Sequence, residues 1–401
     1  MENQGISMKA TWQTKKLGEV CEISAGNSAP QKKELFINGQ HHFIRTSDVG
    51  KIRFGYISIA QDRLNNVGIK KLRLFKKGTL LFPKSGASTF LNHRVMMNAN
   101  GFVSSHLATI KARNNILLDK YFLYYSLMID ARDLMQDQNY PSLRLSDISN
   151  ISIPLPPLSV QRRIVAKLDK AFAAVAKAKE NDEKNLANSK ELFESYLNGV
   201  FTKPGKGWEE KKLGEVCELK SGTTISKSLE KTNGEVLYVK VGDMNMSGNE
   251  EYINSSSRFV GLKDIKINQI IPEGSVIFPK RGGAIFTNKR RKIVKLTIVD
   301  LNTMALVPSK NIYPAFLYHW FMRIDLRDLN NGSSIPQINN YSFDNVFIRY
   351  PKSLYEQKSI VAKLVSISAQ TKKLEAIYTQ KLADLEELKK SVLHKAFAGE
   401  L

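Results

Sequence analysis

Two long stretches of the chain carry apolar residues at intervals of three and four positions. The first lies between Pro157 and Pro204, where Gly199 is the sole residue that disfavours a helix. The second lies between Pro351 and Gly399 and contains neither glycine nor proline. This spacing places the apolar side chains on one stripe of an α-helix, the pattern of a helix that packs against another. We therefore expect long helices over residues 158–203 and 354–401.

These two helices are expected to pack against each other. A helix of about 40 residues is about 60 Å long, and its apolar stripe needs a partner along that length. Because each stretch offers the other such a stripe, we expect an antiparallel, coiled-coil-like pair. The alternative is that each helix packs separately on its own block. The apolar positions expected in the seam include Ile164, Leu168, Leu374, Leu382 and Leu385.

The remaining residues form two blocks with mixed secondary-structure signals. Residues 79–82 and 275–278 are short apolar runs bounded by glycine and proline, the pattern of buried strands. Residues 121–125 and 315–321 are apolar and aromatic runs that we interpret as short buried helices. Strands and helices do not alternate regularly, so we expect an α+β fold rather than a doubly wound parallel sheet.

The chain repeats itself at an offset of 196 residues, the difference between positions 208 and 12. The segment WQTKKLGEVCE, which begins at Trp12, returns as WEEKKLGEVCE at Trp208. Further matches at the same offset are FPK at 82 and 278, IVAKL at 164 and 360, and Ser195, Leu197 and Phe201 with Ser391, Leu393 and Phe397. Matches at one offset indicate an internal duplication. We therefore divide the chain into a globular block, a helix, a second block and a second helix, at 1–157, 158–203, 204–353 and 354–401.

Basic residues outnumber acidic ones by 60 to 38, which gives the chain a net charge of +22. The excess is concentrated in the two blocks: residues 1–157 have 21 basic and 11 acidic side chains, and residues 204–353 have 22 and 15. An excess of this size favours a polyanionic partner such as DNA, because binding releases counterions from the phosphate backbone. A generic basic protein, or one that contacts anionic lipid, is the alternative.

The composition excludes several classes of protein. Hydrophobic residues make up 42% and charged residues 24%, close to the usual values for globular proteins and unlike those of disordered chains. No apolar run approaches the roughly 20 residues of a transmembrane helix, and the N-terminal segment lacks the apolar stretch of a signal peptide. Two cysteines do not make a disulfide framework, so we expect a cytoplasmic protein that does not contact a membrane.

We find no motif that indicates a catalytic or metal-binding site. The sequence lacks a Walker motif, G-x-G-x-x-G, H-E-x-x-H and C-x-x-C. His41 and His42 are adjacent, which favours a solvated turn over metal ligands, and Cys21 and Cys217 occupy the same repeat position, which favours buried packing. We therefore expect a non-catalytic chain. The alternatives are a nuclease or other DNA enzyme with an unrecognised active site, and an RNA-binding or structural adaptor.

Two basic stretches without acidic residues are the candidate DNA-contacting segments. One lies between Asp62 and Asp119 and the other between Glu273 and Asp300, and they overlap under the repeat offset. In each, a predicted strand passes through Phe-Pro-Lys into a turn with glycine, so a rigid strand would present a basic loop to phosphates and base edges. The alternative is a solvated basic surface. The side chains predicted to contact DNA are Lys70, Lys71, Arg73, Lys84, Ser85, Arg94, Lys280, Arg281, Lys289, Arg290, Arg291 and Lys292.

Taken together, these motifs make the chain similar to the specificity subunits of type I restriction–modification systems. The resemblance is carried by the openings at Trp12 and Trp208, by FIRTSD ending at Asp48 and YVKVGD ending at Asp243, and by the C-terminal SVLHKAFAGEL. It covers the whole chain. Three further segments add to it: IPLPPL at 153–158, QRRIVAKL at 161–168 and YPKSL at 350–354.

The resemblance implies a division of labour between this chain and others. Each globular block would be a target-recognition domain that contacts one half of an asymmetric, bipartite site in double-stranded DNA. The two helices would dock two methyltransferase subunits, and two restriction–translocase subunits would join the full complex. S-adenosylmethionine, ATP and magnesium would bind to those partners, and this chain would hold no cofactor.

Overall fold

The computed structural model describes residues 12–115, 117–128, 142–330, 332 and 335–401; the first 11 residues, part of the segment used to judge a signal peptide, lie outside this description. By its internal contacts the chain divides into two units. The first contains residues 1–181 and 382–401, and the second contains 182–381. Each unit therefore combines one globular block with part of each long helix, whereas the sequence-based division treated the helices as separate segments.

The repeated opening motif folds in both units as a strand, a one-turn helix and a second strand. Its leucine, valine and cysteine are buried, so the alternation of apolar and polar residues anchors the motif in the core. The acidic side chain of the motif accepts the backbone N–H at the start of the short helix, from Lys16 to Glu19 and from Lys212 to Glu215. The elements are β1 (Gln13–Lys16), α1 (Leu17–Val20) and β2 (Cys21–Ala25), and β11 (Trp208–Lys212), α6 (Leu213–Val216) and β12 (Cys217–Ser221).

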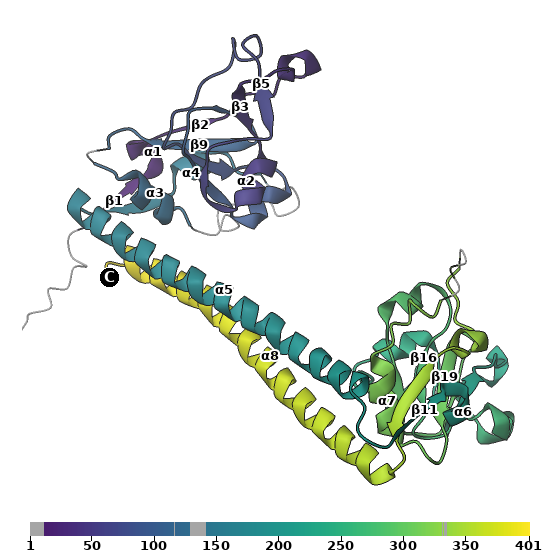
Figure 1. Cartoon of the computed structure of the whole chain (residues 1–401). Helices are drawn as coiled ribbons and strands as arrows, with labels where there is room; N and C mark the ends of the chain where they lie inside the picture. Colours follow the sequence, from purple (N-terminus) through teal and green to yellow (C-terminus); the bar gives the residue numbers. More distant parts are fainter. Residues whose placement is uncertain (1–11, 116, 129–141, 331, 333–334) are drawn as a thin grey trace, which may run out of the picture. The chain divides into compact units, whose positions relative to one another are not determined.

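A mixed five-stranded sheet forms the centre of each block (Figure 1). Its strand order is β2-β9-β6-β7-β4 in the first unit and β12-β19-β16-β17-β14 in the second. The two predicted strands are confirmed, since every residue of β6 and β16 is buried. The further strands are β4 (Phe54–Ile57), β6 (Leu80–Pro83), β7 (Arg94–Met97) and β9 (Leu107–Ala112), and β14 (Tyr252–Ile253), β16 (Val276–Pro279), β17 (Arg291–Ile293) and β19 (Thr303–Pro308).

Two smaller sheets complete each block, again in the same order in both units. The three-stranded sheets are β5-β3-β8 and β15-β13-β18, and the two-stranded sheets are β1-β10 and β11-β20. The shared topology confirms the predicted α+β fold and its duplication. These strands are β3 (His41–Ile44), β5 (Asp62–Leu64), β8 (Phe102–Val103) and β10 (Ser152–Leu155), and β13 (Val236–Val239), β15 (Phe259–Val260), β18 (Thr297–Val299) and β20 (Phe347–Pro351).

Short helices connect these strands. The two that the sequence predicted are confirmed as α3 (Lys120–Ser126) and α7 (Pro314–Met322), and most of their apolar side chains lie in the cores. The others are α2 (Thr46–Ile52) and α4 (Leu145–Ser149) and the 3₁₀ helices η2 (Lys33–Phe36), η3 (Ala87–Leu91), η5 (Lys227–Leu229), η6 (Val241–Asn245), η7 (Leu262–Asp264), η8 (Ile267–Gln269), η9 (Gly282–Thr287) and η10 (Asn340–Phe343).

The two long helices are α5 (Leu158–Thr202) and α8 (Leu354–Phe397), and they pair within each unit. In the first unit, Lys389 lies 5.3 Å from the ring of Phe172, and Lys179 forms an ion pair with Glu386 at 2.7 Å. Positions therefore rise along α5 as they fall along α8, so the pair is antiparallel, as predicted.

In the second unit, α5 and α8 meet in one hydrophobic core, in which Leu197 packs with Leu364. Both helices also pack on the blocks. Because the helices also pair with each other, the alternative that each packs separately on its own block is wrong.

A buried glutamine ties the first turn of each long helix to its block. The Gln161 carboxamide accepts the backbone N–H of Asp119 at 2.8 Å and donates to the carbonyls of Leu117 and Pro156 at 2.9 and 2.8 Å. Gln357, 196 positions later, makes the same three kinds of bond to Tyr313, Asn311 and Pro351 at 2.7, 2.9 and 2.9 Å. Both side chains are fully buried. A carboxamide suits this place because it can accept and donate at once.

Candidate nucleic-acid interface

The loop that follows the central strand has the same backbone connections in both units. The N–H of Lys84 donates to the carbonyl of His106 at 3.0 Å, and that of Lys280 donates to Asn302 at 2.8 Å. On its other side, each lysine carbonyl accepts an N–H at 2.8 Å, from Leu143 in the first unit and from Ile338 in the second. The loop is therefore held between two others and starts from a fixed position.

A 3₁₀ helix comes next in both units, with left-handed backbone near its two ends. Gly86 and Gly282 have φ of 78° and 71°, and Asn92 and Asn288 both have φ of 54°. Glycine and asparagine are the residues that adopt positive φ most readily. The matched positions thus give loops of different sequence the same backbone course.

The side chains on these matched loops differ. In the first unit, the Ser85 hydroxyl and the His106 imidazole form a hydrogen bond of 2.7 Å. In the second, Lys280 donates to the Ser221 hydroxyl at 3.0 Å, and Arg281 is exposed. Partial burial and then the charge of Arg281 lower the pKa of Lys280. Both loops therefore begin with a lysine, Lys84 or Lys280, and differ at the next position, where the first has the Ser85 hydroxyl and the second has the Arg281 guanidinium.

Three of the predicted DNA contacts are interior residues, which corrects the sequence-based prediction for them. The guanidinium of Arg94 lies 3.3 Å from the ring of Phe82, and its Nε donates to the Leu127 carbonyl at 3.1 Å. Arg290, at the equivalent repeat position, lies 4.8 Å from the ring of Phe321, and burial lowers its pKa to about 10. These two arginines stack on core aromatic rings and do not face the solvent.

Lys292 is the third interior cation. It is 7% exposed, forms an ion pair with Glu251 at 2.6 Å, and lies 4.1 and 4.5 Å from the rings of Tyr252 and Tyr318. The run of basic residues at 289–292 suggested a surface loop, yet its second half, Arg291 and Lys292, belongs to β17, beside the central strand. Carbonyls, a carboxylate and aromatic faces compensate for burying these charges.

The other predicted contacts lie at or near the surface and remain predictions. Lys70 and Lys71 are exposed. Arg73 is exposed too, but it pairs with Glu22 and donates to the Ser24 hydroxyl at 2.9 Å. Lys289 donates to the Asn245 carboxamide, and the half-buried Arg291 donates to the Met244 carbonyl at 2.8 Å. Lys84, Ser85 and Lys280 are half-buried, and Arg281 is exposed.

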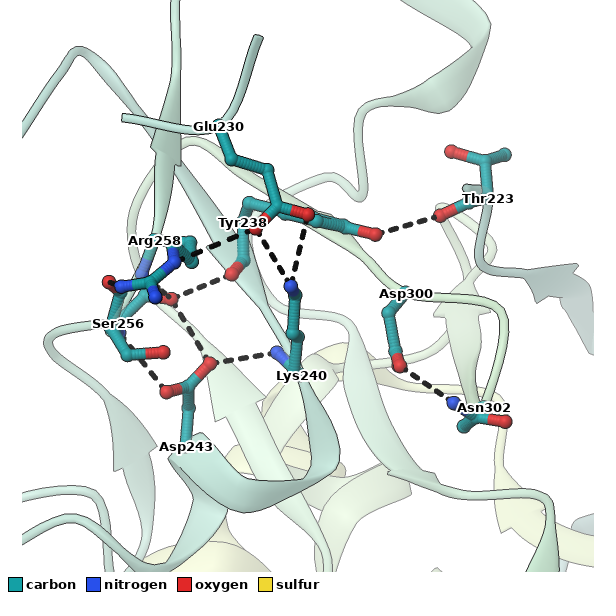
Figure 2. Close-up of polar contacts among 10 residues, drawn as sticks. Thr223, Glu230, Tyr238, Lys240, Asp243, Ser256, Arg258, Asp300 and Asn302 are labelled. Carbon is teal, nitrogen blue, oxygen red and sulfur yellow. Dashed lines mark hydrogen bonds and ion pairs between the residues drawn. The ribbon is translucent and has the colours of Figure 1, made fainter. Parts of the chain in front are cut away.

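A buried aspartate organises the second repeated motif. The Asp48 carboxylate accepts the N–H of Arg45 at 2.9 Å and that of Gln61 at 3.1 Å. In the second unit, Asp243 accepts the N–H of Lys240 at 2.8 Å and that of Ser257 at 3.0 Å (Figure 2). The backbone of Arg45 and that of Lys240 are thus fixed at equivalent positions in the two units. The sequence pointed to both motifs but not to these two cations.

The seam residues fall into two groups. Ile164 and Leu168 are buried in the core of the first unit, so they hold the helix to its block and cannot contact a partner. Leu382 and Leu385 are half-buried, and Leu374 is 36% exposed. Other apolar side chains on the long helices are at least 40% exposed: Leu192, Val365, Ile377 and Leu388.

The cysteines lie in the interior, as predicted. Burial raises the pKa of both Cys21 and Cys217 to about 12, so neither forms a thiolate near neutral pH. Among the described residues, no group of histidine, cysteine and carboxylate side chains is arranged to hold a metal ion. Within the same residues, no helix is both long and apolar enough to cross a membrane.

Residues 9–185 and 205–386 each match the model of one protein family, described as the type I restriction modification DNA specificity domain. The chain belongs to this family. The two matches follow the two copies of the internal repeat, so the resemblance inferred from the sequence motifs is confirmed, and the chain is a type I specificity subunit.

The family's relatives agree with this assignment along the whole chain. The MjaIX specificity subunit of Methanocaldococcus jannaschii is 23% identical over 97% of this chain and 93% of its own length. The HsdS subunit of Thermoanaerobacter tengcongensis has the same fold, with a TM-score of 0.64, 21% identity and all of both chains covered. A chain from a structural study of type I system assembly has a TM-score of 0.78 at 22% identity, covering 98% and 99%.

Proposed function

We propose that this specificity subunit recognises an asymmetric, bipartite DNA site, with each globular block contacting one part of it. The observation that carries the proposal is the pair of loops after β6 and β16, which share a backbone course and differ in side chains. A shared backbone sets the same position on DNA in both halves, and different side chains meet different base edges. Identical halves would favour a palindromic site; these favour two different half-sites.

The proposal assigns the chemical steps to other chains, which assemble with this one in the cytoplasm. Two methyltransferase subunits would dock on the long helices, and two restriction–translocase subunits would join them. Those chains would bind S-adenosylmethionine, ATP and magnesium. Docking on the helices is supported by the apolar side chains that α5 and α8 expose at Leu192, Val365, Ile377 and Leu388, which a partner helix could cover.

Exchanging one block tests the assignment of blocks to half-sites. Replacing residues 20–150 with the equivalent block of another specificity subunit should change one half of the methylated sequence and leave the other half unchanged. The reciprocal exchange of residues 216–346 should change the opposite half. Methylome sequencing of cells that express each chimaera with the methyltransferase subunits measures both halves. A change in both halves, or in neither, would contradict the proposal.

A second experiment tests docking on the helices. Ile377→Asp and Leu388→Asp place a charge on exposed apolar positions of α8, at 40% and 48% exposure, and should reduce co-purification of the methyltransferase subunit at least tenfold. Because these side chains are not in a core, the unfolding temperature should change little. Ile37→Asp and Ile267→Asp are matched controls on exposed positions outside the long helices. Equal loss of partner in all four variants would rule out a specific helix surface.

A further inference from the structure

A basic pocket opens beside the three-stranded sheet of each unit. In the first unit it includes three cations and one carboxylate, and in the second it includes four cations and one carboxylate. The lining residues are Lys33, Phe36, Gly39, Arg45, Gln61, Asp62 and Arg63 in the first unit, and Lys227, Glu230, Lys231, Thr232, Lys240 and Arg258 in the second.

One cation in each pocket is built in the same way. Arg45 and Lys240 come directly after β3 and β13, the central strands of the two three-stranded sheets. Both donate their backbone N–H to a buried aspartate three positions later. Each also lies against the aromatic ring two positions earlier, Arg45 at 5.3 Å from Phe43 and Lys240 at 5.0 Å from Tyr238. The backbone bond and the ring restrict the side chain, so it is oriented before any ligand arrives.

A carboxylate faces this cation in both pockets, but it comes from different elements. In the first unit, Asp62 of β5 pairs with Arg45. In the second, Glu230 follows η5; both of its oxygens accept from Lys240, at 2.8 and 3.0 Å, and Arg258 lies 3.5 Å away (Figure 2). Asp62 and Glu230 thus have the same role, because each carboxylate holds the cation of its pocket in place.

Fold stability does not account for these arrangements. The side chains of Arg45 and Lys240 are 39% and 38% exposed, and ion pairs at such positions contribute only about 0–1 kcal/mol. Each pocket also contains more cations than carboxylates, and an excess of positive charge in a concave surface attracts an anion. The recurrence of the same construction in two blocks of different sequence points to a ligand shared by both.

We propose that each pocket binds a phosphate group of the DNA backbone, with Arg45 as the main contact in the first unit and Lys240 in the second. This inference rests on the proposed function, which supplies the DNA. Contacts to phosphate carry no sequence information and set the register of a protein on the duplex. A matched cation is therefore what two blocks with different half-sites can share, whereas base contacts must differ between them.

The test uses the complex of the chain with its methyltransferase subunits and duplex DNA that contains the methylated site. Arg45→Ala and Lys240→Ala should each weaken binding about tenfold at about 0.1 M salt and lower the slope of log affinity against log salt by about one. The methylated sequence should stay the same. Lys15→Ala and Lys352→Ala are matched controls, since each removes a lysine from a surface ion pair outside the pockets.

Neutralising the carboxylates gives a test of opposite sign. If the pockets hold phosphate, Glu230→Gln and Asp62→Asn should tighten DNA binding several-fold, because each removes a negative charge from beside the ligand. If the ion pairs only stabilise the fold, both variants should lower the unfolding temperature, and binding should be unchanged or weaker. That second result overturns the inference even if an alanine variant fails to fold.

The outcomes separate this inference from the proposed function. A wild-type complex that does not bind its methylated site would contradict the proposed function itself. Normal wild-type binding, with salt slopes unchanged in folded Arg45→Ala and Lys240→Ala, would overturn the phosphate pockets alone.

Discussion

The two units share their strand order, their buried glutamines and their central loops, yet they join the helix pair to the block in different ways. In the first unit, the Tyr125 hydroxyl donates to the carboxylate of Asp169 on α5. Burial and this bond raise the pKa of the Tyr125 hydroxyl. The polar group at this junction is therefore satisfied by the long helix itself.

The second unit has other residues at the same places. The run Phe-Leu-Tyr-Tyr that ends at Tyr125 corresponds to Phe-Leu-Tyr-His ending at His319, and the repeat partner of Asp169 is Val365. His319 is 5% exposed, and its Nε2 has no hydrogen-bond partner among the described residues. A pocket opens here between α7 and the long helices, lined by His319, Met322, Val365 and Thr371 among others.

This difference indicates which parts of the framework are interchangeable. Apolar packing of the long helix on its block is common to both units, as are the glutamine bonds. The polar contact between Tyr125 and Asp169 is present in one unit, and an orphaned imidazole takes its place in the other. The apolar and glutamine contacts are thus the part of the junction that both units share. The polar contacts differ: in the second unit, Trp208 Nε1 on β11 donates to the carboxylate of Glu356 on α8 at 3.0 Å.

The largest effect is expected from the feature that the units share. Gln161→Ala and Gln357→Ala each remove three hydrogen bonds and leave an N–H and two carbonyls without partners, at a cost of about 4 kcal/mol in the free energy of unfolding. Urea unfolding of each variant measures this cost. Leu192→Ala, at a position 53% exposed on α5, is the control. A loss below about 1 kcal/mol in either glutamine variant would contradict the equivalence of the two anchors.

A pH-dependent difference between the units is the next largest effect. Burial, followed by the charge of Lys292, lowers the pKa of His319 from 6.5 to about 4. Folded His319 stays neutral while the unfolded chain binds a proton below about pH 6.5, so the free energy of unfolding should fall as the pH drops from about 6.5 to about 4. The loss is at most about 3 kcal/mol.

Unfolding experiments across this pH range test that difference. His319→Phe should flatten the acid side of the stability profile, because it removes the group that titrates. Tyr125→His combined with Asp169→Val copies the second unit, introduces such a group without a facing carboxylate, and should steepen the profile. If wild type and His319→Phe lose stability in parallel down to pH 4, another group is responsible.

The smallest effect is expected from the polar contact of the first unit. Tyr125→Phe removes the bond to Asp169 and should cost about 1 kcal/mol, because the carboxylate is exposed and can bind water instead. Asp169→Val, which copies the second unit, should cost a similar amount. A double variant that costs no more than either single variant would confirm that both act through one interaction.

Local patterns predicted much of the fold. The spacing of apolar residues predicted α5 and α8, and short apolar runs between glycine and proline predicted β6 and β16. These elements could be predicted because each depends on residues close together in the sequence. The bonds of Gln161 and Gln357 join residues 42 and 44 positions apart, so no local pattern indicates them. Their shared repeat position was the available signal.

The candidate interface was harder to predict because charge does not report burial. Arg94 and Arg290 belong to basic stretches, but they stack on core rings, and sequence alone does not distinguish a stacked arginine from a solvated one. The search for stretches without acidic residues also excluded Arg45 and Lys240, since Asp48 and Asp243 follow them three positions later. In these pockets carboxylates hold the cation in place, so a search for stretches without acidic residues could not find them.

The first unit is made of two separate segments of the chain, and this determines the order in which the units can fold during synthesis. Its core includes Ala396 and packs against Leu393 and Phe397, whose ring lies 5.3 Å from that of Phe122. Residues 182–381 form the second unit and are made before these side chains. The second unit can therefore complete its core on the ribosome first, although the block of the first unit emerges earlier. Until residues 382–401 are made, the block of the first unit exposes the apolar surface that these residues later cover. Such exposure favours aggregation or binding by chaperones.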